Sequence, residues 1–100
     1  MGQEQFSVKE RINVRAKEPK EYKVIFHNDD FTTMEFVIEV LRTVFYKDFT
    51  AAYAIMLDVH KKGKGVVGTY TYDMATTKRD RATELAREEG FPLKITIQEA

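Results

Sequence analysis

Residues His27–Val37 read HNDDFTTMEFV and mark the passage from a predicted strand to a predicted helix. One Ser, Thr, Asp or Asn is enough to satisfy free N–H groups at a helix start. Thr32 stands three residues before Glu35, which is the spacing of a capping box, so we expect Thr32 to cap this helix. Asn28 and the two aspartates after it are then surplus to the cap. They predict either a cation site or an ordinary polar turn.

The apolar pattern on either side of this stretch predicts the neighbouring elements. Tyr22–Phe26 is a short run rich in β-branched and aromatic residues, which predicts a first strand. Downstream, apolar residues at helical spacing predict a helix that reaches Phe45. A second helix follows, with Asp48 or Thr50 as its cap and Gly63 as its stop. Its apolar stripe is wide, so we expect this second helix to be largely buried.

Three further elements complete the pattern. Val66–Tyr72 predicts a second strand and Asp73–Glu89 a third helix, and apolar and polar residues then alternate from Leu93 to Gln98 as in a last strand. The order β-α-α-β-α-β predicts a two-layer α+β domain over residues 22–100. We expect a three-stranded antiparallel sheet with three helices on one face.

Composition narrows the functional class. The 100 residues include 16 basic and 16 acidic side chains and no cysteine. A net charge of zero gives no strong field to attract nucleic acid or anionic lipid, and no apolar run has the length of a membrane span. We therefore expect neither nucleic-acid nor membrane partners. We also expect a cytoplasmic protein, which the lack of cysteine is compatible with, and a monomer. Residues 1–21 carry mixed charges and few apolar side chains, which predicts a flexible N-terminal extension.

Cofactor and metal sites are weaker interpretations of this sequence than a binding site. Gly63–Gly68 matches G-x-G-x-x-G, but a dinucleotide site needs a strand before the glycines and a helix after them, and here the order is reversed. The glycines are better read as a helix stop followed by a tight turn. A metal site built from His27, His60 and the aspartates at 29 and 30 is chemically possible. No spaced ligand pair anchors it, so we expect no metal.

His60 has two interpretations. It falls on the inner stripe of the second helix, where a lone histidine is often a hydrogen-bonded core residue. If that helix packs against the end of the first strand, His60 can instead face Asn28 and Asp29. Nucleophilic catalysis lacks a partner, because the chain has no cysteine and its one serine, Ser7, lies in the extension. We therefore expect no enzymatic activity.

Several short motifs occur along residues 22–100 in a distinctive order and spacing. They are Tyr22–Ile25 (YKVI), Asn28–Thr32 (NDDFT), Met34–Val37 (MEFV), Met56–His60 (MLDVH), Gly63–Lys64, Thr77–Lys78 and Pro92–Leu93. Together they resemble the ClpS family, the adaptors of the ATP-dependent Clp protease. The chain departs from the family's pattern at His27, where an aliphatic residue is usual, and at Thr33, where proline is usual. His27 adds a titratable group beside the expected site.

The resemblance implies a non-catalytic N-end rule adaptor without a cofactor. Such an adaptor binds proteins by a hydrophobic N-terminal residue, Leu, Phe, Tyr or Trp, and hands these N-degron substrates to the N-terminal domain of a ClpA-like or ClpC-like unfoldase. A free α-amino group is a cation with three N–H donors, so its receptor needs convergent acceptors. Asn28, Asp29 and His60 can supply them. Asp30 is a further candidate, which can instead hold the turn or receive a backbone N–H of the peptide.

The resemblance also implies an apolar pocket for the side chain of the first substrate residue. Taken singly, each lining residue would be an ordinary core residue, and only their convergence beside surplus acceptors favours a pocket. The lining residues are Thr32, Met34, Val37, Met56, Val59 and Leu93.

Asp73 and Lys78 match family positions that contact the unfoldase; the alternative is two exposed helix residues. The competing function is an interaction module of similar fold that binds another partner without N-terminal recognition, as the C-terminal domain of the ribosomal stalk protein does.

Overall fold

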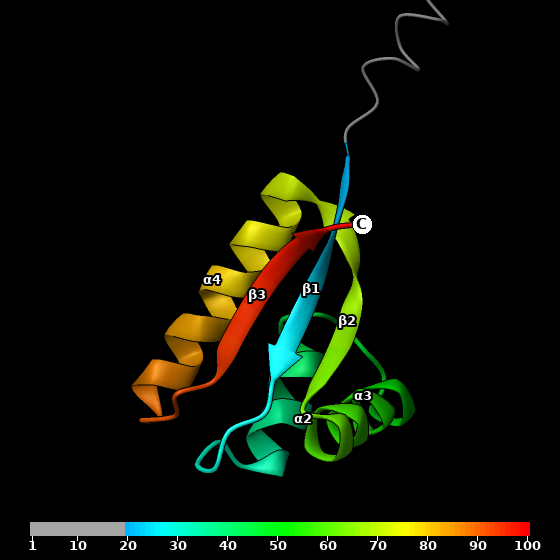
Figure 1. The fold of residues 1–100 in the computed structure, drawn as a ribbon. Helices are drawn as coiled ribbons and strands as arrows, with labels where there is room; N and C mark the ends of the chain where they lie inside the picture. Colours follow the sequence, from blue (N-terminus) through cyan, green and yellow to red (C-terminus); the bar gives the residue numbers. More distant parts are fainter. Residues whose placement is uncertain (1–19) are drawn as a thin grey trace, which may run out of the picture.

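Strands and helices alternate in the predicted order β-α-α-β-α-β in the computed structural model, which describes residues 20–100. Figure 1 shows these elements along the chain. The predicted flexible extension lies, as far as residue 19, outside the described residues. The elements are β1 Glu21–His27, α2 Met34–Thr43, α3 Phe49–Lys62, β2 Lys64–Thr71, α4 Tyr72–Glu88 and β3 Lys94–Glu99.

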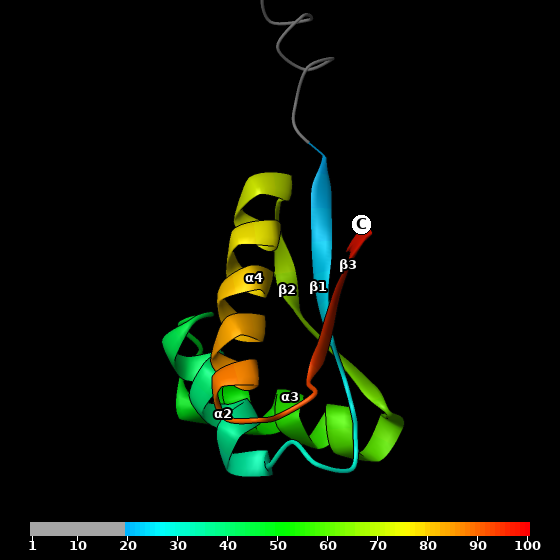
Figure 2. The same cartoon turned by 90° about the vertical axis from the view of Figure 1, so that its left-hand side faces the viewer.

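The sheet has the strand order β2-β1-β3, and β1 pairs antiparallel with both neighbours. Long β1 side chains on one face, among them Val24 and Phe26, are completely buried. Figure 2 shows α4 running along that side of the sheet, with α2 and α3 gathered at the end where β1 finishes. The predicted α+β class with a three-stranded antiparallel sheet and three helices is confirmed.

Helix starts follow the expected chemistry with one correction. Thr33, not Thr32, caps α2: its backbone is extended and its hydroxyl accepts a hydrogen bond from the Phe36 N–H at 3.1 Å. The Thr32 hydroxyl is instead directed to the turn, where it donates to the Asp29 carboxylate at 2.7 Å. Asp48 caps α3, which decides between the two predicted caps. The predicted cap is therefore wrong by one residue, and the predicted capping box does not form, because Phe36 stands three residues after Thr33.

The second helix, α3, is less buried than its sequence suggests. Only Ala52, Met56 and Val59 are buried on it, while Tyr53 and His60 are exposed. The reason is position: α3 lies at the end of the sheet, in contact with α2 and β2, so only one narrow stripe is covered. The prediction of a largely buried helix is wrong.

The glycines after α3 are a helix stop and a close-packing site. Gly63 has a φ of 86° and ends α3, with its N–H donating to the Val59 carbonyl at 3.0 Å. At Gly65, a Cβ would lie 2.9 Å from Cγ2 of Val59, so only glycine lets β2 pass this close to α3. Both observations support a turn in place of a nucleotide-binding loop. Within residues 20–100, no helix is long and apolar enough to cross a membrane.

Candidate functional site

A cleft of about 570 Å³ opens where the end of β1, the start of α2 and the last turns of α3 meet. Acceptor side chains lie at one end of its lining, and apolar side chains form the rest. The lining residues are Asn28, Asp29, Asp30, Phe31, Thr32, Thr33, Met34, Glu35, Val37, Met56, Val59 and His60.

The cleft brings together every residue predicted to bind the substrate except Leu93. That side chain is 1% exposed, belongs to the core and does not line the cleft. Sequence reasoning missed Phe31, Thr33 and Glu35 as lining residues. Phe31 carried a signal, because a large apolar side chain between acceptors in a turn is unusual, and it is 72% exposed.

Asp29 organises the turn that leads into α2. Its Oδ1 accepts hydrogen bonds from the backbone N–H groups of Phe31 and Thr32 at 2.8 and 2.7 Å, and its Oδ2 accepts from the Thr32 hydroxyl. Asp29 therefore makes the polar turn that the sequence left open as an alternative. The sequence suggested that Asp29 was surplus to the local structure, and this prediction is wrong. Oδ1 already accepts two hydrogen bonds, but Oδ2 accepts one and can accept another from a ligand.

The same contacts keep Asp29 ionised. Partial burial raises the pKa of Asp29, but the hydrogen bonds from the Thr32 N–H and hydroxyl, that from the Phe31 N–H, and the nearby positive charge of Arg87 together outweigh it. The pKa of Asp29 therefore lies below its ordinary value of 3.8. A full negative charge is available in the cleft at neutral pH.

A backbone hydrogen bond joins the two acceptor-bearing segments. The Asn28 N–H donates to the carbonyl of Gly63, the residue that ends α3, at 2.9 Å. This contact holds the end of β1 against the last turn of α3, which carries His60. His60 is exposed and lines the cleft, so the interpretation of His60 as a core histidine is wrong.

His27 belongs to a different neighbourhood. Its Nε2 is hydrogen-bonded to the Thr96 hydroxyl at 2.8 Å, and in the sheet it stands opposite Lys64 on one side and Lys94 on the other. Partial burial, with the charges of Lys94 and Lys64, lowers the pKa of His27 below its ordinary value of 6.5. His27 does not line the cleft. In residues 20–100, no group of three or more His, Asp or Glu side chains has the arrangement of a metal site.

The apolar part of the cleft is made partly of core residues. Val37, Met56 and Val59 are nearly fully buried and belong to the hydrophobic core that α2 and α3 share with the sheet. Met34, in the first turn of α2, is 48% exposed and therefore lies at the rim. The floor of the cleft is thus packed into the core, and the flexible Met34 side chain lies at its edge.

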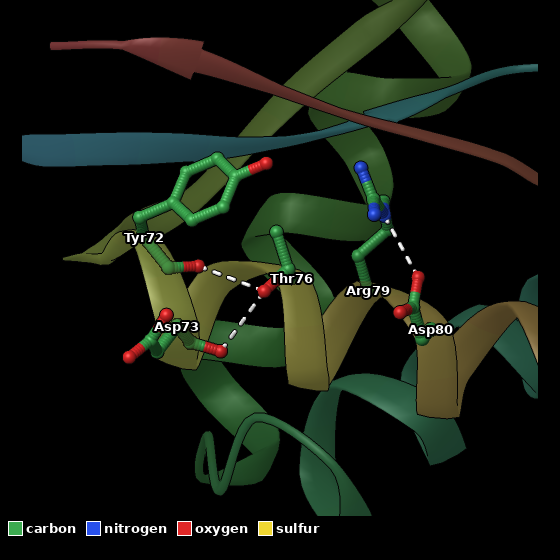
Figure 3. Close-up of polar contacts among 5 residues, drawn as sticks. All are labelled: Tyr72, Asp73, Thr76, Arg79 and Asp80. Atoms are coloured by element: carbon green, nitrogen blue, oxygen red, sulfur yellow. Dashed lines mark hydrogen bonds and ion pairs between the residues drawn. The ribbon is translucent and has the colours of Figure 1, made fainter.

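The start of α4 carries the first of the two residues predicted to contact an unfoldase. Figure 3 shows the Thr76 hydroxyl donating to the backbone carbonyls of Tyr72 and Asp73, and Arg79 paired with Asp80. The Asp73 carboxylate points away from these contacts and is exposed. It is available to a partner.

Lys78 is placed differently from Asp73. Its ammonium donates to the Val44 carbonyl at 2.9 Å and lies 4.7 Å from the centre of the Tyr46 ring and 5.7 Å from that of Tyr70. The side chain is half-buried and ties α4 to the C-terminal end of α2. Asp73 fits the alternative of an exposed helix residue, and Lys78 does not.

An acceptor-lined cleft with an apolar floor, on a small α+β domain, is the arrangement of a ligand-binding module. A family model for the ATP-dependent Clp protease adaptor protein ClpS matches residues 17–96. The chain belongs to the ClpS family of Clp protease adaptors.

Known proteins agree with this assignment over most of the chain. The Clp protease adapter protein ClpS of Acetivibrio thermocellus is 55% identical, covering 91% of this chain and 92% of that protein. The ClpS of Desulforapulum autotrophicum is 51% identical, with 92% of each chain covered. The structure of Agrobacterium tumefaciens ClpS2 bound to L-phenylalaninamide is similar, with a TM-score of 0.80 and 41% identity, and covers 83% of this chain and 100% of that one.

Proposed function

We propose that this adaptor recognises substrates by an N-terminal Leu, Phe, Tyr or Trp and delivers them to a ClpA-like or ClpC-like unfoldase as a cytoplasmic monomer. The observation that carries the proposal is the meeting of Asn28, Asp29 and His60 with an apolar floor in one cleft. A receptor for a hydrophobic N-terminal residue needs acceptors for the α-amino group and an apolar surface for the side chain, no further apart than the length of one amino acid.

The acceptors suit a free α-amino group. An ammonium has three N–H donors and a positive charge, and hydrogen bonds to charged groups are shorter and stronger than neutral ones. The Asn28 side-chain oxygen, the Asp29 carboxylate and a ring nitrogen of His60 offer three acceptors. The lowered pKa of Asp29 keeps one of them negative at neutral pH. Asp30 also lines the cleft, and we assign it to a backbone N–H of the bound chain.

The floor suits the side chain of the first residue. Val37, Met56 and Val59 present only hydrocarbon and sulfur to the cleft. The ligand of the Agrobacterium protein, L-phenylalaninamide, has a free α-amine, a benzyl side chain and an amide where a second residue would begin. The fold that binds it is similar to that of this chain at a TM-score of 0.80, which supports the same mode of binding here.

The expected affinity is moderate. Burying one Leu or Phe side chain contributes about 1.5–3 kcal/mol, and each hydrogen bond to a charged group about 1.5–3 kcal/mol. The loss of translational and rotational freedom offsets much of this gain. A net value near −8 kcal/mol, or a Kd of about 1 μM, is compatible with these terms and with later release of the substrate.

Acetylation of the peptide amine tests the proposal. We expect labelled peptides that begin with free Leu or Phe to bind in fluorescence anisotropy, and their N-acetylated forms to lose at least tenfold in affinity, about 1.4 kcal/mol. Acetylation removes the charge and leaves acceptors of the cleft without donors. A peptide that begins with Ser serves as the control for the apolar floor. Equal binding of free and acetylated peptides would favour an interaction module that does not read N-termini.

A further inference from the structure

A second cleft, of about 290 Å³, lies between α2 and the C-terminal end of α4. Its floor is apolar and includes Phe36 and Phe91, whose rings meet edge to face with centres 5.1 Å apart. Four glutamates surround this floor. Two are on α2, Glu35 and Glu39, and two are at the end of α4, Glu88 and Glu89.

The cleft carries four carboxylates, and the positive charge next to its lining, that of Arg87, is bound to the Phe91 carbonyl at 2.8 Å and not to a glutamate. None of the four glutamates forms an ion pair with any of residues 20–100. The lining residues, all of them within that range, include no Lys, Arg or His. Four like charges around an apolar floor repel each other, and a cation placed among them relieves that repulsion. The complementary ligand is a positive group on an aliphatic stem.

The second cleft lies next to the candidate peptide site. Thr33 and Glu35 line both clefts, so they share a wall made by the cap and the first turn of α2. A chain anchored by its first residue in the peptide site can pass over this wall and reach the second cleft. Only the residues between the two clefts need to be ordered for the substrate to reach the second cleft.

We propose that the second cleft binds a Lys or Arg side chain of the same substrate polypeptide, a few residues after its N-terminus. The inference rests on the proposed function, because the peptide site provides the anchor. The aliphatic stem of the basic residue packs on Phe36 and Phe91, and its charged end meets the glutamates. The protein then selects substrates by a downstream charge as well as by the first residue.

The size of the shared wall sets the position of the basic residue. An α-helix with its side chains is about 10–12 Å across, and an extended chain advances about 3.3 Å per residue. Three or four residues therefore span the first turn of α2. Residue 4 or 5 of the substrate reaches the second cleft, whereas residue 2 is still at the wall.

The test compares uncharged peptides that begin with free Leu and carry one Lys at position 2, 3, 4 or 5. We expect the intact protein to bind the peptides with Lys at position 4 or 5 about threefold to fivefold more tightly than the all-neutral peptide at low salt. The gain falls as ionic strength rises, because all four glutamates are exposed to solvent. Glutamate at position 4 or 5 reverses the effect.

Two variants locate the effect. The double substitution Glu39→Gln with Glu88→Gln should remove the lysine gain while the affinity for the neutral peptide stays unchanged, because neither residue lines the peptide site. Glu84→Gln is the matched control, since Glu84 is an exposed glutamate of α4 outside the second cleft. A lysine gain that survives the double substitution, or that is equal at all four positions, would overturn the inference. If the neutral Leu peptide itself does not bind, the proposed function fails instead.

Discussion

In the proposed function, Asp29 has both a structural and a binding role, whereas His60 has a binding role alone. Asp29 makes three hydrogen bonds within its own turn, whereas His60 is exposed at the end of α3. We expect His60→Ala to reduce peptide affinity at least tenfold, about 1.4 kcal/mol, without lowering the melting temperature. Asp29→Ala should reduce both, because it leaves two backbone N–H groups without acceptors. Peptide titrations with thermal melts separate the two cases.

A drop in the melting temperature of His60→Ala as large as that of Asp29→Ala would contradict this assignment. Asn28→Ala provides a further control. Its contact with Gly63 is made by the backbone N–H, which the substitution keeps, so affinity should fall while the turn stays in place.

His27 makes the stability of the fold depend on pH. Its pKa is lowered from 6.5, first by partial burial and then by Lys94 and Lys64, so the folded protein binds a proton less readily than the unfolded chain. The stabilising contribution of neutral His27 is complete above pH 6.5 and is lost as the pH falls below that value. We expect urea denaturation to show a smaller free energy of unfolding at pH 5 than at pH 7.5.

His27→Gln isolates this effect, because glutamine can keep a hydrogen bond to Thr96 and does not titrate. The variant should show a smaller difference between pH 5 and pH 7.5. Asp29 does not interfere, since its lowered pKa places its own transition below 3.8. An unchanged pH difference in His27→Gln would show that another group is responsible.

Met34 lies at the rim of the cleft, where we expect it to control which first residues enter. A flexible thioether at the rim can close around a ring or a γ-branched side chain, but it crowds a side chain branched at the β carbon. We expect Met34→Ala to admit peptides that begin with Val or Ile, raising their affinity relative to Leu about tenfold. The melting temperature should change little, because Met34 is about half exposed. Reduced stability with an unchanged Leu-to-Ile affinity ratio would identify Met34 as a packing residue only.

At the scale of the element, α4 carries Asp73 and Lys78, the two residues that the resemblance assigned to one contact with the unfoldase. Asp73 and Lys78 are five positions apart, or about 140° around the helix, so they do not share a face. Lys78 holds the Val44 carbonyl and lies against Tyr46 and Tyr70, whereas Asp73 is exposed. A substitution at Lys78 therefore tests the fold as well as any contact with an unfoldase.

Charge reversal at Asp73 is the cleaner test of unfoldase contact. We expect Asp73→Lys to weaken binding to the N-terminal domain of the cognate unfoldase while peptide affinity and melting temperature stay the same. Lys78→Met should lower the free energy of unfolding by about 1–3 kcal/mol, because it leaves the Val44 carbonyl without its donor. Full unfoldase binding by Asp73→Lys in a pull-down or titration would remove Asp73 from the contact surface.

At the scale of the whole molecule, the order of elements was predictable because it rests on local patterns. Gly63 and the alternation of the last strand depend only on neighbouring residues, and both were read correctly. The cap of α2 was misplaced because Thr32 and Thr33 are equivalent in sequence, and only the hydrogen bond from Thr32 to Asp29 distinguishes them. The exposure of His60 depends on where α3 sits relative to the sheet, which no local pattern encodes.

Prediction of the site was uneven for the same reason. Asn28 and Met34 are close together in sequence, and both line the cleft. Leu93 comes from the far end of the chain and is covered by the core. The second, acidic cleft was not foreseen, because its glutamates come from two helices whose contact is a tertiary feature.

Because Val37, Met56 and Val59 belong to both the core and the floor of the cleft, the site vanishes when the domain unfolds. A ligand held on these side chains binds the folded state alone, and a peptide present at a hundred times its Kd adds about 2.7 kcal/mol to the free energy of unfolding. An adaptor that carries a peptide in this cleft is itself harder to unfold than an empty one. In the proposed function, we therefore expect a bound peptide to protect the adaptor from being unfolded while it contacts the unfoldase.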